Sequence, residues 1–243
     1  IRTHLDEIEK ALGKEIEGIE KILFGGSIAK STFIEGTSDV DALVILDSSK
    51  YKNASPKDLQ QEFLKMLWHR FPKTEIKCGA LAVTVKFKDY EIQLLPAMKQ
   101  NGKLKIANSD GNGWSASIDS SAFTKKLTAI NQTNGNKVVP VIKLAKSLFN
   151  NLPSQYQLSG YHVEALAVEA FSVYNGRYTL YDMTKHMLDY STRRVLNPMN
   201  DVTGQSSEID SNFGGRNSMI RQQLSHQIKN IAGKFSGETA NAK

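Results

Sequence analysis

Two aspartates, Asp39 and Asp41, open a run of apolar residues that ends at Leu46. Turn-forming residues at positions 36–38 precede this run, so the pattern predicts a buried strand. Because side chains alternate between the two faces of a strand, both carboxylates point the same way and Val40 points into the core. Carboxylate pairs of this kind bind Mg²⁺, which takes oxygen ligands and is often shared with substrate phosphates. The spacing therefore indicates a metal site at one end of a sheet.

A glycine-rich turn, Gly25-Gly26-Ser27, comes shortly before the aspartates. Glycine lets the backbone come close to a phosphate, and residues 28–32 can begin a helix whose N-terminus favours anions. Taken alone, such a turn is also typical of a plain loop, and an Asp-x-Asp pattern is also typical of a solvated strand end. In this order, within one short stretch, the two motifs predict a phosphate-binding turn beside a metal site.

The order of a Gly-Ser turn, a short basic helix and an Asp-x-Asp strand resembles the signature of the polymerase-β-like nucleotidyltransferases. The pattern GS-x-x-K-x-T, then S-D-x-D, is similar to the branch that holds 2′-5′-oligoadenylate synthases, cyclic GMP-AMP synthase and the bacterial CD-NTases of CBASS anti-phage systems. The resemblance implies an α+β fold with a mixed-sheet catalytic domain over residues 1–135. A helical domain like that of oligoadenylate synthases would follow over residues 136–243, and the two would enclose a cleft.

The resemblance also implies an activity. The enzyme would transfer a nucleotidyl group from a nucleoside triphosphate such as ATP to a ribose hydroxyl of a second nucleotide, with release of pyrophosphate. Two Mg²⁺ or Mn²⁺ ions would be held by Asp39 and Asp41. Gly26, Ser27 and Lys30 would steady the β- and γ-phosphates. Repeated transfer and ring closure would give a cyclic di- or trinucleotide second messenger in anti-phage signalling.

A second strand, EIQLLPA from Glu91 to Ala97, resembles the family strand that carries a third catalytic acid three residues before its proline. Here that position is Gln93, whose amide cannot take a proton from a hydroxyl and binds magnesium more weakly than a carboxylate does. Three interpretations are open: Glu91 on the same strand face is the third acid, the site is silent or works with two acids, or Gln93 is an engineered substitution. Glu91 also fits an edge residue without chemistry.

Two helices in the second half carry the remaining candidate residues. Apolar residues from Val138 to Asn150 predict a helix that places Lys143 and Lys146 on another face, one turn apart. The next helix opens at Leu158-Ser159-Gly160-Tyr161-His162. The resemblance implies that these lysines and Ser159 bind the triphosphate and that Tyr161 stacks on a base. Without it, the lysines fit a solvated helix face and Ser159 fits an N-cap.

The elements around these motifs are predicted from periodicity and turn chemistry. Apolar residues at three- and four-residue steps predict one amphipathic helix from Leu5 to Leu23. Ser55-Pro56 predicts the start of a helix that runs to about Trp68. Two strands at 81–87 and 90–95 complete an αβαββ order. We expect a surface loop at 98–120 and further helices at 122–132, 178–196 and 218–235.

The composition, 40% apolar over 243 residues, suits a packed globular protein. No apolar run has transmembrane length and no signal-peptide pattern opens the chain, so we expect a soluble, cytoplasmic protein without membrane contact. Cys78, the single cysteine, excludes a disulfide framework and a Cys-rich zinc site, and we expect it to be buried. The net charge of +6 suits nucleotide or nucleic-acid partners. A regulatory protein is a further expected partner.

Two rival functions fit parts of the same pattern. One is a template-independent transferase that acts on an RNA end, such as a tRNA CCA-adding enzyme, whose helical domain also has a Ser-Gly-Tyr sequence. No long basic stripe supports a stable nucleic-acid partner. The other rival is a catalytically silent module that still binds nucleotides but cannot catalyse transfer, because Gln93 replaces the third acid.

Overall fold

The computed structural model describes residues 2–15, 18–34, 40–51, 53–79, 81–88, 90–100, 103–108, 113–115, 119, 121–205 and 208–240. Asp39 and the turn before it lie outside the described residues. By their internal packing the residues form two compact units. We call them the sheet unit (Ile1–Ala29 and Ser38–Ser120) and the helical unit (Lys30–Thr37 and Ser121–Lys243). The helix α4 (Ala122–Thr133) belongs to the helical unit because it packs against α5 (Val138–Phe149) and α6 (Gly160–Ser172).

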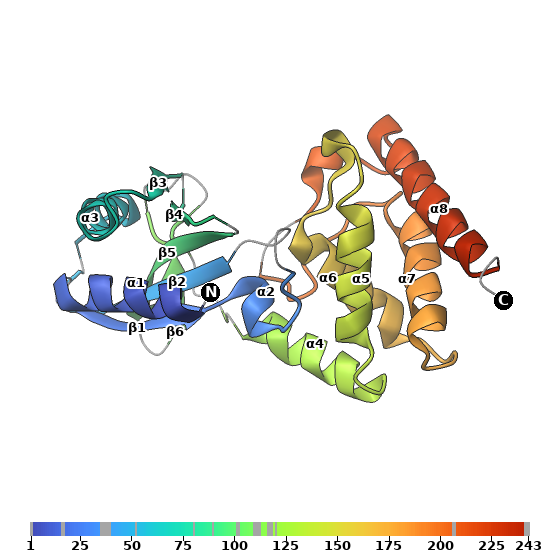
Figure 1. The fold of residues 1–243 in the computed structure, drawn as a ribbon, viewed down its shortest axis with the longest axis horizontal. Coiled ribbons are helices and arrows are strands. Elements are labelled where there is room, and N and C mark those ends of the chain that lie inside the picture. Colours follow the sequence, from blue (N-terminus) through green and yellow to red (C-terminus); the bar gives the residue numbers. More distant parts are fainter. Residues whose placement is uncertain are drawn as a thin grey trace. The chain divides into compact units, whose positions relative to one another are not determined.

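The sheet unit is built on a mixed sheet in which six strands are described, in the order β1-β2-β5-β4-β3 with β6 paired to β5 (Figure 1). The two central strands, β2 and β5, run parallel, and the other pairs are antiparallel. Helices α1 and α3 pack against each other, and α3 also covers β3, β4 and β5. The strands are β1 (Ile19–Phe24), β2 (Val40–Leu46), β3 (Glu75–Cys78), β4 (Val83–Lys86), β5 (Glu91–Gln100) and β6 (Lys103–Ile106). The helices of this unit are α1 (Arg2–Glu15), α2 (Gly26–Ala29) and α3 (Pro56–Arg70).

The strand from Val40 to Leu46 forms as the sequence predicts. Val40, Ala42 and Val44 are buried, whereas Asp41 and Leu43 are only partly covered. The helix α3 also begins as expected: Ser55 caps it by accepting the backbone N–H of Asp58 at 3.1 Å, and Pro56 is its first residue. Both predictions rest on local signals that the packing reinforces.

The single helix expected from Leu5 to Leu23 is wrong. The helix α1 ends at Glu15, Gly18 adopts a φ of +110°, and β1 then pairs antiparallel with β2. A left-handed φ is incompatible with a continuous helix, and glycine adopts it at little cost. The apolar residues of β1 therefore complete the sheet instead of extending a helix.

The region expected to be a surface loop after Met98 also differs. The strand β5 continues to Gln100, and β6 adds to it antiparallel from Ala97↔Ile106 onward. The strand β4 pairs only with the first part of β5, ending at Val83↔Leu94, so Pro96 lies between the two neighbours. Among the described residues, Pro96 thus has a strand partner only on the β2 side, and a gap between two neighbours is a position that proline tolerates.

Cys78 is exposed, and the expected burial of its thiol is wrong. It is the last residue of β3, which pairs with β4 alone among the described strands and so lies at one edge of the described sheet. The nearby residue Ile76 supplies the buried contact of this short strand instead.

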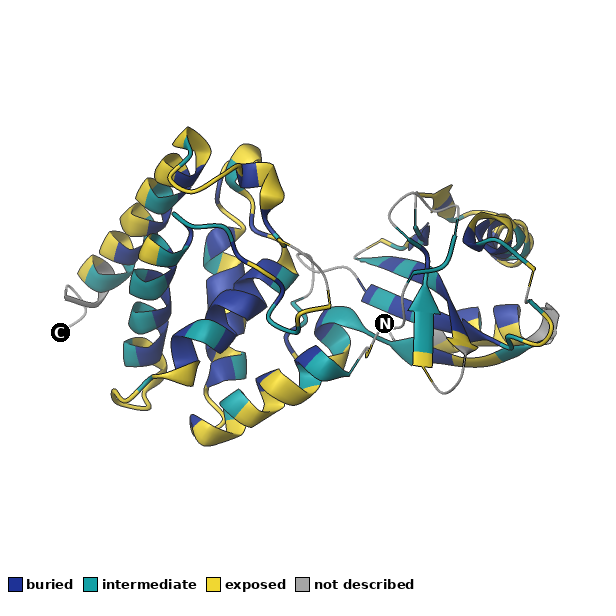
Figure 2. Ribbon diagram, turned by 180° about the vertical axis from the view of Figure 1, so that it is seen from behind, coloured by how far each residue is buried: buried dark blue, intermediate teal, exposed yellow. Residues whose placement is uncertain are grey.

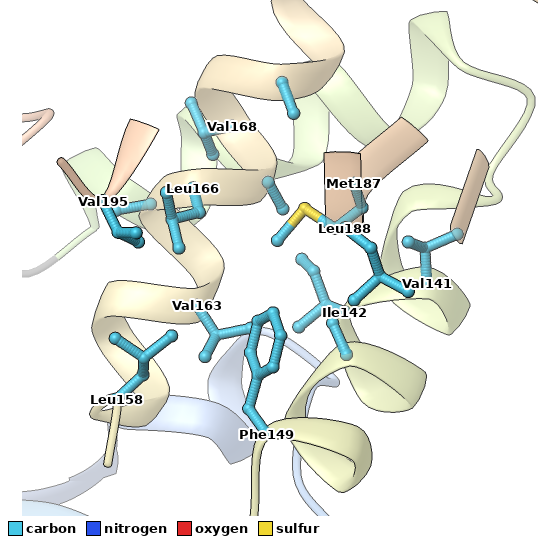
Figure 3. Packing of buried hydrophobic residues seen from close by; sticks show 14 of the residues in the cluster. Val141, Ile142, Phe149, Leu158, Val163, Leu166, Val168, Met187, Leu188 and Val195 are labelled. Carbon is cyan, nitrogen blue, oxygen red and sulfur yellow. The ribbon is translucent and has the colours of Figure 1, made fainter. Parts of the chain in front are cut away.

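In the helical unit, the described α-helices α4 to α8 pack around one apolar core. The helix α6 is buried along most of its length, as Figure 2 shows, and it contacts α4, α5 and α7. Figure 3 shows side chains of α5, α6 and α7 meeting in this core, among them Ile142, Val163 and Met187. The remaining bounds are α5 (Val138–Phe149), α6 (Gly160–Ser172), α7 (Leu180–Arg194) and α8 (Met219–Ala240). Among the described helices, none is long and apolar enough to cross a membrane.

Candidate active site

The glycine turn and the aspartate strand meet in the sheet unit. The backbone N–H of Gly25 donates to the carbonyl of Asp41 at 2.9 Å, and Gly26 adopts a φ of +52°. A Cβ atom on Gly26 would lie 1.9 Å from Oδ2 of Asp41, so the carboxylate occupies the space that any side chain would need. Glycine is therefore required twice here, for the left-handed φ and for the close approach of Asp41.

The helix after the turn is a single turn. The helix α2 covers Gly26 to Ala29, so it takes in the first residues of the stretch 28–32 that was expected to begin a helix, and Ser31 beyond it has a left-handed φ of +58°. Ser27 is buried within this single turn, which packs on β2. A four-residue helix has too few aligned peptides for a strong dipole. Any phosphate binding here would rest on the local backbone and on Ser27.

Gln93 is the direct neighbour of Asp41 in the sheet. The two residues are partners across the parallel pair of β2 and β5, and Gln93 is in turn the partner of Thr84 on β4. Directly paired residues share a face of the sheet. Asp41, Gln93 and Thr84 thus form one row, with the amide at its centre.

Glu91 lies on the same face as Gln93, as the period of two predicts, but two residues earlier in β5. Its partner across the sheet is Lys86, and its carboxylate lies 3.5 Å from the Lys86 ammonium. Gln93 and not Glu91 therefore stands beside Asp41.

The side-chain oxygens of this row are of the chemical kind that binds a magnesium ion. Asp41 offers a carboxylate and Gln93 a neutral amide oxygen, and both are oxygen ligands of the kind that magnesium takes. Within the described ranges no group of three His, Cys, Asp or Glu side chains could hold a metal ion. Asp39, the other predicted ligand, is outside those ranges, so its role stays a prediction.

In the helical unit, Lys30 and Lys146 contact the same buried acid, Glu164 of α6. The ammonium of Lys30 lies 2.5 Å from Oε2, and that of Lys146 lies 2.8 Å from Oε1. The hydroxyl of Thr32 also donates to Oε1. All three charged side chains are buried, with exposed fractions of 9%, 6% and 1%. The structure thus brings together two of the lysines predicted to bind phosphate, but around a carboxylate.

Lys143 and Lys146, which the sequence places away from the apolar face of their helix, have different surroundings in the structure. Lys143 is exposed on α5, whereas Lys146 turns into the unit toward Glu164. Sequence reasoning missed Glu164, although a single signal was available. It is a lone acid within an apolar stretch at the start of α6, where burial without a cation would be very costly.

Ser159 and Tyr161 lie at the start of α6. Ser159 is the N-cap and accepts the backbone N–H of His162 at 3.1 Å, as its interpretation without chemistry predicts. The Tyr161 ring contacts Phe123 with centroids 4.7 Å apart, and its hydroxyl donates to Asp201. Burial and the neighbouring carboxylate raise the pKa of Tyr161, so the phenol stays a protonated donor.

Asp201 was not found from the sequence. Besides the Tyr161 hydroxyl, it accepts the backbone N–H groups of Thr203 at 3.0 Å and Gln205 at 3.1 Å. These local bonds are typical of an aspartate that opens a turn. The Asp-Val-Thr-Gly sequence was the available signal for the turn, but nothing local links it to Tyr161.

Residues 1–131 match the family model described as the Second Messenger Oligonucleotide or Dinucleotide Synthetase domain, or SMODS. No curated protein matches the sequence.

Solved structures match the fold over nearly the whole chain. The CdnE cyclic dinucleotide synthase of Elizabethkingia meningoseptica, solved with GTP and Apcpp, is 15% identical with a TM-score of 0.71, and the match covers 96% of this chain and 92% of that one. The CD-NTase CdnG of Bradyrhizobium diazoefficiens in complex with GTP is 10% identical with a TM-score of 0.71, over 98% and 86% of the two chains. The CdnC:HORMA-deltaN complex of E. coli MS115-1 is 13% identical with a TM-score of 0.66, and the match covers 96% of this chain and 80% of that one. The predicted α+β fold, a polymerase-β-like mixed sheet with a helical unit, is confirmed.

Proposed function

Because the chain belongs to the family of Second Messenger Oligonucleotide or Dinucleotide Synthetase domains, we propose that it is a nucleotidyltransferase that makes a cyclic oligonucleotide from nucleoside triphosphates. The product would be a cyclic di- or trinucleotide, formed with release of pyrophosphate from substrates such as ATP. The observation that carries the proposal is the close packing of Asp41 against the Gly26 backbone, within the matched region. The nucleotides in the related CdnE and CdnG structures support triphosphate substrates.

The residues of the sheet unit would divide the work of binding and orientation. Asp39 and Asp41 would hold two Mg²⁺ or Mn²⁺ ions. Bound there, the ions would supply electrostatic stabilisation of the transferred phosphoryl group and of the leaving pyrophosphate. The Gly26 backbone and the Ser27 side chain would contact the triphosphate, together with Lys30, Lys143 and the start of α6 at Ser159.

Gln93 would face the acceptor hydroxyl from the row beside Asp41. Its amide can hydrogen-bond that hydroxyl and hold it in place, but it cannot take the proton. Proton removal would therefore depend on the two aspartates or on solvent, and we expect slower transfer than with a carboxylate at position 93. This slower two-acid site is the form of the proposal that best fits the pairing of Asp41 with Gln93.

The direct test is to incubate the purified protein with all four nucleoside triphosphates and Mg²⁺ or Mn²⁺, treat with phosphatase and analyse by mass spectrometry. We expect phosphatase-resistant cyclic products from the wild type and none from Asp41→Asn. Asp47→Asn is the matched control, since it makes the same chemical change just beyond the other end of β2. Label incorporated into tRNA instead would favour the RNA-end transferase, and absence of any product would contradict the proposal.

A silent nucleotide-binding module is the second candidate, and Gln93 is the observation that favours it. Such a protein would bind triphosphates without forming a product under any of these conditions. Equilibrium binding measured beside the product assay separates it from an active cyclase.

We also infer an anti-phage signalling role and a regulatory protein partner in the cytoplasm. The E. coli CdnC:HORMA-deltaN complex, in which a chain of similar fold is bound to a second protein, supports the protein partner. Co-purification of the protein from its native host, followed by mass spectrometry, would identify such a partner.

A further inference from the structure

Glu164 is a buried carboxylate whose two oxygens have different partners. Its Oε2 contacts the ammonium of Lys30, and its Oε1 contacts Lys146 and the Thr32 hydroxyl. An acid with an exposed fraction of 1% must be compensated by cations or donors. With two ammonium groups to one carboxylate, the cluster carries an excess positive charge, which suits an anion.

The Lys146 ammonium is fully used within the cluster. It contacts Oε1 of Glu164 at 2.8 Å, the carbonyl of Thr32 at 3.2 Å and the Thr32 hydroxyl at 3.3 Å. An ammonium has three donors, and three acceptors are in place. A Cβ on Gly160 would lie only 3.4 Å from Nζ of Lys146, so the start of α6 closes over it. Lys146 therefore secures the segment after α2 to the helical unit.

The Lys30 ammonium is held differently. Among the residues that the structure describes, Glu164 is the one acid that it contacts. Its other neighbours are ring faces, with Nζ 4.8 Å from the Phe123 centroid and 5.5 Å from the Tyr161 centroid. Ring faces attract a cation but fix no particular N–H direction. Lys30 thus keeps donors that a phosphate oxygen can take.

We propose that Glu164 is a positioning residue that holds Lys30 ready for the phosphates of a nucleoside triphosphate, and that Lys146 is a structural partner of Glu164. The inference rests on the proposed function, since it assigns a ligand to Lys30. A lysine–glutamate ion pair that sets the lysine for phosphate binding is also required in protein kinases. Without the carboxylate, two neighbouring ammonium groups would repel each other and Lys30 would move.

The experiment measures equilibrium binding of ATP, in the presence of Mg²⁺, to the full chain and its variants. We expect Glu164→Gln and Lys30→Met each to weaken binding about tenfold, in line with a charge-assisted contact. The double variant should bind no more weakly than either single variant, because both remove the same contact. Lys146→Met should lower the thermal unfolding midpoint more than it changes ATP affinity.

Glu169→Gln is the matched control, because Glu169 is also on α6 and is paired with Arg194 at 2.6 Å, away from the cluster. It should leave ATP affinity unchanged. Glu164→Asp serves as a second variant if Glu164→Gln does not fold. It keeps the charge but withdraws the carboxylate by one methylene, and we expect the same coupling to Lys30→Met.

Two results would overturn the inference alone: wild-type ATP affinity in Glu164→Gln, or losses that add fully in the double variant. Absence of ATP binding by the wild type would instead overturn the proposed function and this inference with it. The binding of the wild type therefore tells the two failures apart.

Discussion

Asp41 and Gln93 stand opposite each other on the parallel strands β2 and β5. Because this pairing places the amide where a third acid would face the same substrate, we expect Gln93→Glu to raise the rate of nucleotidyl transfer. General-base catalysis typically contributes about 10²-fold or more. The measurement is pyrophosphate release with all four nucleoside triphosphates. A rate unchanged by the substitution would mean that position 93 does not face the reacting hydroxyl.

Glu91→Gln tests the competing assignment of the third acid. Glu91 shares the face of Gln93, but it lies two residues earlier in β5 and is paired with Lys86, whereas Gln93 is paired with Asp41. We therefore expect little change in transfer. Complete loss of product in this variant, with the fold intact by circular dichroism, would identify Glu91 as the acid after all.

Gly26→Ala should abolish transfer. The new Cβ would lie 1.9 Å from Oδ2 of Asp41, so the carboxylate must move, and the left-handed φ adds a cost of about 1–2 kcal/mol. Gly25→Ala is the matched control, since its Cβ would come no closer than 3.9 Å to Asp41. Product formation and the urea midpoint of each variant give the result. Equal activity of both variants would show that the contact of Gly26 with Asp41 does not matter.

The strength of local patterns decided how much of the fold could be predicted. The strand at Val40–Leu46 and the helix after Ser55 carry dense apolar runs and a cap, and both were found. The strand β1 was not predicted, because its apolar residues also fit the spacing of a helix. The left-handed φ of Gly18 ends the helical path before β1, and the sequence pattern does not show it. The sequence Lys-Leu-Lys-Ile of β6 looks like a loop, and β5 orders it by pairing.

The candidate site shows the same limit. The glycine turn and Asp41 lie close together in sequence, so their contact could be anticipated. The hydrogen bond from Thr32 to Glu164 joins residues 132 positions apart, so no local sequence pattern could predict it. The sequence placed Lys146 away from the apolar face of its helix, because helical periodicity alone cannot show that the side chain is buried against a distant carboxylate. Long-range charge pairing was the missing information.

His162 should make the stability of the helical unit depend on pH. Burial lowers its pKa from 6.5 to about 4, opposed by Asp210 at 3.7 Å and assisted by the charge of Arg221. Arg194 lowers this pKa further and Glu169 raises it. The unfolded chain then binds a proton between about pH 6.5 and 4 that the folded chain does not, so stability falls as the pH falls through this window.

The expected loss is about 2 kcal/mol between pH 7 and pH 5. Urea unfolding followed by circular dichroism at the two pH values measures it. Trp68 and Trp114 both belong to the sheet unit, so tryptophan fluorescence follows that unit separately. His162→Phe, which cannot titrate, should flatten the pH dependence. The pKa of Asp210 is also lowered, but its contribution is lost only below its ordinary range near pH 4. An unchanged pH dependence in His162→Phe would assign the effect to another group.

Arg221, in the first turn of α8, joins that helix to the segment before it, and its removal should strongly destabilise the helical unit. Its guanidinium has no solvent exposure and donates to Oδ2 of Asp210 at 2.7 Å. It also donates to the backbone carbonyls of Val195, Asn197, Asp210 and Gly214. Arg221→Met would leave a buried carboxylate and these carbonyls without their donor, at a cost of about 3–5 kcal/mol.

Urea unfolding of Arg221→Met by circular dichroism gives this cost, with Arg216→Met as the control. Arg216 is exposed, so its substitution should change the unfolding free energy by less than about 0.5 kcal/mol. Adding Asp210→Asn to Arg221→Met should recover part of the loss, because the unpaired charge is then gone. If the double variant were instead less stable by the full sum of the two single losses, the ion pair would not be the source of the stability, and the backbone contacts of Arg221 alone would explain it.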